Sequence, residues 1–155
     1  MDIDSITGLI VNAAYKVHTG LGPGLLESVY ETVLASELMR QGLYVQRQLA
    51  INFEFEGTKF EDSFRLDLFV QRAVIVELKS LECLAEVHFK QILTYMRLSH
   101  VPVGLLINFG ASTLKEGLHR VVNNYKPSEG SPFTAAAKSG NKPKKDSRRD
   151  AEDAV

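Results

Sequence analysis

The sequence predicts an α/β domain in which helices flank one mixed sheet of four or slightly more strands. The chain has 155 residues, the size of one domain, and is 45% hydrophobic and 24% charged, which is typical of a globular protein with a core. Segments with helical spacing of apolar residues alternate with segments of period two. Their order is helix, helix, three strands, helix, strand, helix. This order fits a sheet in which a helical crossover adds the last strand.

A glycine-rich break separates the first two predicted helices. Apolar residues recur at helical spacing from about residue 5 to residue 18. Segment 19–24 contains three glycines and a proline, which end this helix. A second helix is predicted from about 25 to 41. Its apolar side comprises Leu26, Tyr30, Val33, Leu34 and Leu38.

Three strands are predicted to follow, joined as hairpins. Apolar and polar residues alternate from 45 to 55 and again from 60 to 70, around a turn at Glu56-Gly57. The third strand, 73–79, has the apolar centre Val74-Ile75-Val76. Such a strand is typical of a sheet centre that is covered on both faces.

The rest of the domain is predicted to contain a helix, a strand and a final helix. The first of these covers about 86–98 and the strand covers 103–109. Thr113-x-x-Glu116 has the form of a capping box and predicts a helix that ends near Tyr125. The inward-facing residues of this helix would be Leu118, Val121 and Val122.

Beyond Pro127 the hydrophobic pattern stops. Gly, Pro, Ser, Ala and charged residues of both signs dominate as far as Val155. We therefore expect a folded domain at 1–126 and a disordered charged tail at 127–155.

Composition limits the cellular setting and the partners. The single cysteine, Cys83, excludes an internal disulfide and a multi-cysteine zinc site, and it favours a reducing cytoplasm. No apolar run approaches the roughly 20 residues that span a bilayer, and the acidic start is unlike a signal peptide, so we expect no membrane association. Residues 1–126 include 12 basic and 14 acidic residues. A dedicated nucleic-acid binder is usually basic, so a role on nucleic acid must be argued from a site.

Charged residues interrupt two of the apolar strands. Glu77 and Lys79 are two positions apart, so both side chains lie on one face of the third strand. Burying them without partners is costly, and a metal ion with further carboxylates would relieve that cost. Asp67 is the further carboxylate if the turn before the third strand has three residues, 71–73, or if the hairpin contains a bulge. A two-residue turn would instead direct Asp67 away from Glu77.

Such an arrangement has a specific chemistry. Two adjacent carboxylates are hard oxygen ligands suited to Mg²⁺ or Mn²⁺, which bind phosphate and lower the pKa of a bound water. Lys79 would orient or deprotonate that water and stabilise the developing charge. Glu27 is predicted at the edge of the buried stripe of its helix, from which it would complete the metal site directly or through water.

This pattern resembles the D…(D/E)-x-K signature of the PD-(D/E)XK nuclease superfamily. The resemblance implies a restriction-endonuclease-like core, with Asp67 and Glu77 as metal ligands and Lys79 as the catalytic lysine. It also implies the carbonyl of Leu78 as a further ligand. The function that follows is a Mg²⁺- or Mn²⁺-dependent nuclease that hydrolyses phosphodiester bonds in DNA.

A second motif resembles one branch of the same superfamily. Residues 24–30, Gly-Leu-Leu-Glu-Ser-Val-Tyr, are similar to the Gly-x-x-Glu-x-x-Tyr motif that names the GxxExxY family. This implies Glu27 as the helix carboxylate of the site and gives Tyr30 a supporting place. Gln91-x-x-x-Tyr95 is similar to the Q-x-x-x-Y helix of exonuclease-like members, where it supports the site and contacts DNA. The likeness covers about residues 5–125.

The sequence also allows other interpretations of these residues and of the function. Glu77 and Lys79 could form a structural ion pair or lie on an exposed edge, and Glu27 could simply interact with a helix dipole. A catalytically silent module of this fold, binding nucleic acid or a protein partner, would also fit the near-neutral charge, as would a regulatory protein whose tail recruits partners. A homodimer would help a small domain to hold a duplex.

Overall fold

The structure is a computed structural model, and it describes residues 1–126. The predicted tail, 127–155, lies outside the described residues. The helices are α1 (Ile3–Leu21), α2 (Glu27–Arg40), α3 (Glu86–Leu98) and α4 (Leu114–Gly117). The strands are β1 (Val45–Phe55), β2 (Thr58–Val70), β3 (Val74–Lys79), β4 (Val103–Asn108) and β5 (Leu118–Val122).

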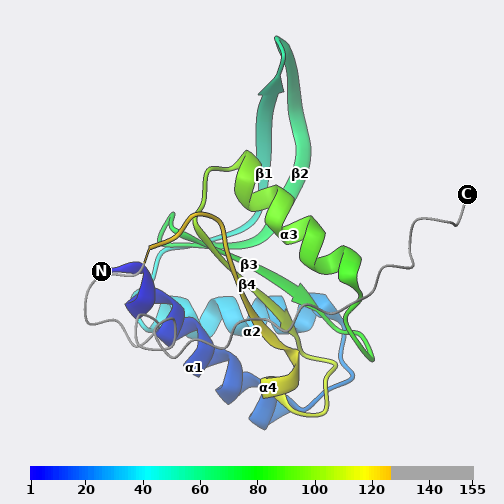
Figure 1. Ribbon diagram of the computed structural model, residues 1–155. Coiled ribbons are helices and arrows are strands. Elements are labelled where there is room, and N and C mark those ends of the chain that lie inside the picture. The colour runs from blue at the N-terminus through cyan, green and yellow to red at the C-terminus, as the bar shows by residue number, and fades with distance from the viewer. Residues whose placement is uncertain (127–155) are drawn as a thin grey trace, which may run out of the picture. The chain divides into compact units, whose positions relative to one another are not determined.

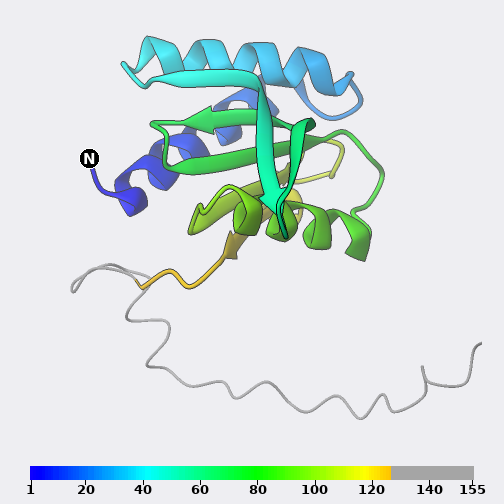
Figure 2. The same ribbon diagram turned by 90° about the horizontal axis from the view of Figure 1, so that it is seen from above.

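The five strands form one mixed sheet in the order β1-β2-β3-β4-β5. Only β3 and β4 are parallel, and α3 makes the crossover between them. Helices α1 and α2 lie on one face of the sheet and α3 on the other (Figures 1 and 2). This architecture confirms the predicted α/β fold with a restriction-endonuclease-like core. No described helix has the length and apolar character needed to cross a membrane.

Each face of the sheet contributes to its own apolar cluster. Val74, Val76 and Leu78 are buried with α1 and α2, whereas Ile75 is buried with residues of α3. The period-two alternation of a strand therefore directs the side chains of β3 alternately into the two clusters. The same alternation places Glu77 and Lys79 on the face of Ile75, toward α3.

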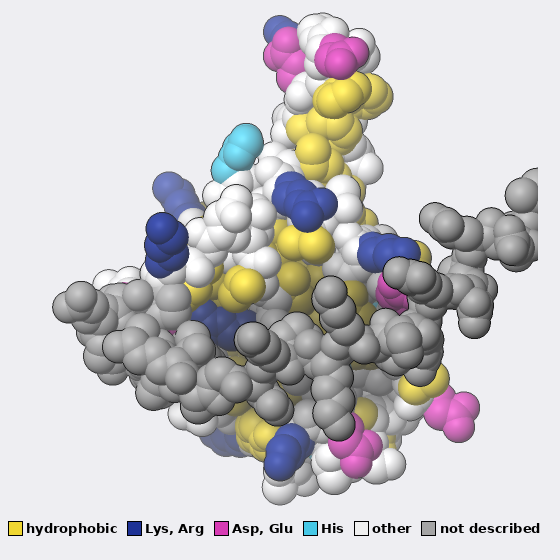
Figure 3. All heavy atoms as spheres, in the orientation of Figure 1, with side chains coloured by type: hydrophobic (Ala, Val, Ile, Leu, Met, Phe, Trp, Pro, Cys, Tyr) yellow, Lys and Arg dark blue, Asp and Glu magenta, His cyan; other side chains and the backbone are white. Residues whose placement is uncertain are grey.

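The β1–β2 hairpin extends beyond the rest of the sheet (Figure 1). Strand β2 has 13 residues and β3 only six, so the outer part of β2 has no partner other than β1. Phe53 and Phe60 stack there with ring centroids 4.8 Å apart. Figure 3 shows hydrophobic side chains along the hairpin and charged side chains at its tip.

The prediction of a final helix that continues to Tyr125 is wrong, although a short helix does begin after Thr113. Helix α4 ends at Gly117, and the next residues form strand β5, antiparallel to β4. A Cβ on Gly117 would lie 2.2 Å from the carbonyl oxygen of Asn108, so the backbones approach closely where the helix stops. Val121 packs toward the α3 cluster, but Val122 is exposed. Pairing with β5 satisfies the backbone groups along the open edge of β4, which a helix would leave without strand partners.

Gly117→Ala is expected to destabilise the fold by about 2 kcal/mol or more, because the new methyl group would collide with backbone and not with a flexible side chain. Gly8→Ala is the control. Gly8 lies in α1, and a Cβ there would meet nothing within 4 Å, so this change should stabilise slightly. Chemical denaturation of both variants checks the prediction, which equal stabilities would contradict.

A smaller correction concerns the start of α2. The helix begins at Glu27, and Leu26 is its N-cap residue. Leu26 was expected on the apolar side of the helix, but its exposed fraction is 74%. The reason is that Leu26 precedes the first helical turn, where the chain still runs in an extended conformation (ψ 148°) and the helical periodicity does not yet apply.

Candidate active site

The turn between β2 and β3 determines whether the two strand acids meet. Val70 pairs with Val74 and Leu68 with Val76, so the turn consists of the three residues 71–73. Gln71 and Arg72 adopt left-handed conformations, with φ of 54° and 49°. The odd-length connection that the site requires is therefore confirmed, and the same register sets Asp67 opposite Glu77.

At Asp67 and Glu77 the two strands separate, and hydrogen bonds from side chains to backbone replace the backbone pairing between them. A carboxylate oxygen of Glu77 accepts a hydrogen bond from the backbone N–H of Asp67 at 3.2 Å. In return, Asp67 Oδ2 accepts from the backbone N–H of Leu78 at 2.9 Å. The carboxyl groups of the two acids consequently lie side by side between the diverging strands.

The acid pair is poorly compensated by positive charge. Glu77 is only 5% exposed. Burial, and next the neighbouring charge of Asp67, raise the pKa of Glu77 to about 8, while the Lys79 ammonium opposes this rise only weakly. Among the described residues, no carboxylate oxygen lies within 4.0 Å of Lys79 Nζ. A structural Glu77–Lys79 ion pair is therefore absent from the part of the chain that the structure describes.

Asp67 borders a cavity of about 260 Å³ that also reaches α2. The other lining residues are Glu27, Ser28, Glu31, Gln48 and Leu78. Glu27 thus opens onto the same space as Asp67, and its side chain is exposed. Within residues 1–126, no three acidic, histidine or cysteine side chains are close enough to hold a metal together. Glu27 is therefore not placed as a direct third ligand beside the strand acids.

A carboxylate that the sequence interpretation missed is Glu31. It is 8% exposed and accepts hydrogen bonds from Arg47 at 2.9 Å and from Gln48 Nε2 at 2.5 Å. Gln48 Nε2 also lies 3.2 Å from Asp67 Oδ1. Glu31 and Gln48 therefore connect α2 and β1 to the acid pair. The one signal in the sequence was the four-residue spacing from Glu27, which places both acids on one helix face.

Helix α3 supplies Tyr95 and Gln91. The Tyr95 ring stacks on Phe64 with centroids 4.2 Å apart. Burial, then the charge of Glu77 and more weakly that of Asp67, raise the pKa of Tyr95, and Gln91 hydrogen-bonds its side chain. Tyr95 therefore lies within electrostatic range of both acids, with Gln91 beside it.

Tyr30 ties down the loop that precedes α2. Its hydroxyl donates to the carbonyl of Gly22 at 2.5 Å and accepts from the N–H of Leu25 at 3.1 Å. Its ring is fully buried and stacks on Phe109 at 4.5 Å. Gly24 has φ of 104°, a conformation that L side chains rarely adopt. Tyr30 and Gly24 thus position the start of α2, from which Glu27 projects.

Tyr30→Phe is expected to cost about 1–3 kcal/mol of stability, because both partners of the hydroxyl would lose a hydrogen bond in a partly buried place. Tyr15→Phe, on an exposed ring of α1, should have little effect. Thermal or urea denaturation compares the two variants. Equal losses would show that the hydroxyl does not hold the loop.

Asp67 and Glu77, between the diverging ends of β2 and β3, fit a divalent cation. Mg²⁺ and Mn²⁺ are commonly held by one or two carboxylates, with water and substrate oxygens completing the shell. Asp67 and Glu77 supply two such groups next to the backbone of Leu78. The raised pKa of Glu77 shows that a positive charge between them would be stabilising.

Comparison with known proteins identifies the family of this chain. A family model described as the PD-(D/E)XK nuclease superfamily matches residues 4–121, more than half of the chain. No curated protein and no solved structure matches. The matched segment includes the diverging strands, Lys79, and both helices that border the acid pair. This chain therefore belongs to the PD-(D/E)XK nuclease superfamily.

Proposed function

We propose that this protein is a Mg²⁺- or Mn²⁺-dependent nuclease that hydrolyses phosphodiester bonds in DNA. Its catalytic residues would be Glu27, Asp67, Glu77 and Lys79. Membership of a nuclease superfamily supports hydrolysis of a nucleic acid. The observation that carries the proposal is the buried Glu77 paired with Asp67 between diverging strands, with too little positive charge around the two carboxylates.

Each residue has a role that follows from its place. Asp67 and Glu77, with the carbonyl of Leu78, would hold the cation. When bound, the cation would supply Lewis acidity toward the phosphate and lower the pKa of a water molecule. Lys79, on the same face of β3 as Glu77, would orient that water and stabilise negative charge on the phosphate. Glu27 would act through water, since it borders the cavity of Asp67 without joining a three-acid cluster.

We also assign the chain to the GxxExxY branch of the superfamily. The positive φ of Gly24, the loop contacts of Tyr30 and the position of Glu27 at the cavity give each named residue of the motif a physical task, and this supports the assignment. Gln91 and Tyr95 would support the acid pair from α3 and contact DNA. A cytoplasmic location remains our proposal, on the ground of cysteine usage.

A catalytically silent binding module is the second candidate. The near-neutral charge of residues 1–126 favours it, because a nuclease that grips a duplex by its phosphates usually presents a basic surface. This module would bind nucleic acid or a protein partner with the acid pair lacking a metal. We propose a homodimer for both candidate functions.

The test is cleavage of plasmid, single-stranded DNA and RNA with Mn²⁺ or Mg²⁺ and with EDTA. We expect metal-dependent cleavage by the wild type and its loss in Asp67→Asn. Asp62→Asn, an exposed acid near the hairpin tip, is the matched control and should retain full activity. If the folded wild type cleaves none of these substrates and binds no Mn²⁺ by calorimetry, the silent module is correct.

A further inference from the structure

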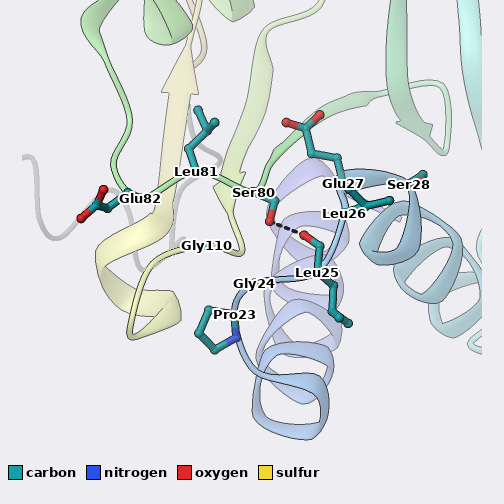
Figure 4. A pocket seen from close by; sticks show the side chains of 10 residues that line it. All are labelled: Pro23, Gly24, Leu25, Leu26, Glu27, Ser28, Ser80, Leu81, Glu82 and Gly110. Carbon is teal, nitrogen blue, oxygen red and sulfur yellow. Dashed lines mark hydrogen bonds between the residues drawn. The ribbon is translucent and has the colours of Figure 1, made fainter.

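A larger cavity adjoins the one that contains Asp67. Its volume is about 770 Å³, within the range of roughly 300–1,000 Å³ that is usual for ligand pockets. Residues 23–28 form one wall, and residues 80–82 with Gly110 form the other (Figure 4). Glu27 and Ser28 line both cavities. A polymer bound at the acid pair would therefore reach this second space.

Hydrogen bonds fix both walls of the cavity. The hydroxyl of Ser80 donates to the carbonyl of Leu25 and so joins the end of β3 to the loop before α2 (Figure 4). The Asn108 side chain accepts from the N–H of Leu81 at 2.9 Å and donates to its carbonyl at 3.0 Å. A Cβ on Gly110 would lie 2.2 Å from that same carbonyl oxygen, so backbone packs on backbone there. The cavity is thus preformed, which lowers the entropy cost of binding.

The fixed walls present apolar side chains to solvent. Leu25, Leu26 and Leu81 are 40%, 74% and 36% exposed. Leu26 occupies an N-cap, a position that favours Ser, Thr, Asp or Asn, and no side chain caps this helix end. Neither core packing nor helix formation accounts for a leucine at this position. A residue that breaks a local rule beside a candidate active site is best explained by contact with a ligand.

Charge indicates which part of a nucleic acid would bind. No lysine or arginine lines the cavity, and its ionisable residues are Glu27 and Glu82. Two carboxylates repel phosphate, whereas three leucines attract an uncharged, flat group with apolar faces. A nucleobase has these properties, and the sugar-phosphate backbone does not.

We propose that this cavity binds an unpaired nucleobase next to the phosphate that the cation at Asp67 and Glu77 would hold. This inference rests on the proposed function. A base inside a duplex must first leave its stack and its partner, which costs free energy, so the cavity favours single strands, flaps and frayed ends. Leu26 would contact the base, with Leu25 and Leu81 on the walls beside it.

The test measures binding of a labelled oligonucleotide by fluorescence anisotropy, with Ca²⁺ in place of Mn²⁺ so that affinity is separated from cleavage. Leu26→Ser removes the apolar contact and supplies a favoured N-cap residue, so α2 should be kept. We expect it to weaken single-strand binding about tenfold and duplex binding much less. Leu26→Met should retain the wild-type affinity. Met39→Ser, at an exposed apolar site in the last turn of the same helix, is the control.

A second measurement identifies the contacted group. A series of oligonucleotides, each with one abasic position, should include one that binds the wild type about tenfold more weakly but binds Leu26→Ser with no further loss. Equal affinities of wild type and Leu26→Ser for single strands would overturn the inference, as would absence of single-strand binding by the wild type. A change of oligomeric state in Leu26→Ser with unchanged oligonucleotide affinity would also overturn it, because the leucines would then belong to an interface between copies.

The two proposals can fail separately. If the wild type cleaves DNA but Leu26→Ser leaves KM and affinity unchanged, the base-binding cavity is wrong and the nuclease stands. If Leu26→Ser weakens single-strand binding while no divalent metal supports cleavage, the cavity stands and the nuclease is wrong.

Discussion

Glu77→Gln is expected to abolish metal-dependent cleavage and, in metal-free buffer, to stabilise the protein at alkaline pH. The two effects have one cause, because the carboxylate that would hold the cation is costly to bury without it. Cleavage should fall by about 10³-fold or more, since loss of a ligand removes the cation from the reaction. If Glu77 only stabilised the fold, its replacement by Gln would instead lower the stability of the metal-free protein.

The pH dependence follows from the raised pKa of Glu77. This group has an ordinary pKa of 4.5 and a folded-state pKa of about 8, so between these values the folded protein binds a proton that the unfolded chain has lost. Stability of the metal-free protein therefore falls as pH rises through this window, by up to about 1.4 kcal/mol per pH unit from this group. Below the window the contribution is fully present, and above it the loss is complete.

Urea denaturation of the two proteins in EDTA, from pH 5 to pH 9, measures this effect. The variant should match the wild type near pH 5, exceed it increasingly up to about pH 8, and keep that margin at pH 9. Glu86→Gln is the control, because that side chain is 83% exposed and should leave the pH dependence unchanged. Parallel curves of stability against pH for wild type and Glu77→Gln would show that the pKa of Glu77 is not raised in the folded protein.

Lys79→Met is expected to reduce cleavage by about 10²-fold or more while leaving Mn²⁺ affinity nearly unchanged. The proposed task of Lys79 is to act on water and phosphate, so removing its ammonium group should affect the reaction and not the cation. Methionine keeps most of the aliphatic length of the side chain. Single-turnover cleavage and calorimetry on the same preparation give the two values.

Lys90→Met controls for loss of positive charge, because Lys90 on α3 is exposed, with 72% of its side chain accessible. It should cleave like the wild type at moderate ionic strength. Loss of Mn²⁺ binding in Lys79→Met would assign Lys79 a structural part in the cation site. Full activity in Lys79→Met would remove it from the mechanism.

The alignment of the strand acids was predictable because chemistry restricted the geometry. A buried Glu77 on a central strand needs a partner, and only an odd-length turn brings Asp67 opposite it. The pairing of Val70 with Val74 confirms that turn. Local sequence pattern and the cost of burial together were sufficient here, because the two strands are neighbours along the chain.

Elements that depend on distant contacts were not predictable. Leu118, Val121 and Val122 have helical spacing, yet they form an edge strand because β4 offers backbone partners and Gly117 approaches Asn108. The deciding groups lie about ten residues away or in another strand. Spacing alone therefore favoured the wrong element.

The polar residues around the site were missed for the same reason. The contact of Glu31 with Gln48 joins residues 17 positions apart. The hydrogen bonds of Asn108 to Leu81 join residues 27 positions apart. Neither role leaves a periodic pattern in the sequence. The three-dimensional contacts were needed to find them.

The proposed cation site is tested most directly by a crystal structure of the protein soaked in Mn²⁺, with anomalous difference density used to locate the ion. We expect one strong peak between the carboxylates of Asp67 and Glu77, absent in crystals of Asp67→Asn. A well-ordered acid pair with no peak at millimolar Mn²⁺, or a peak only at another place in the molecule, would contradict it.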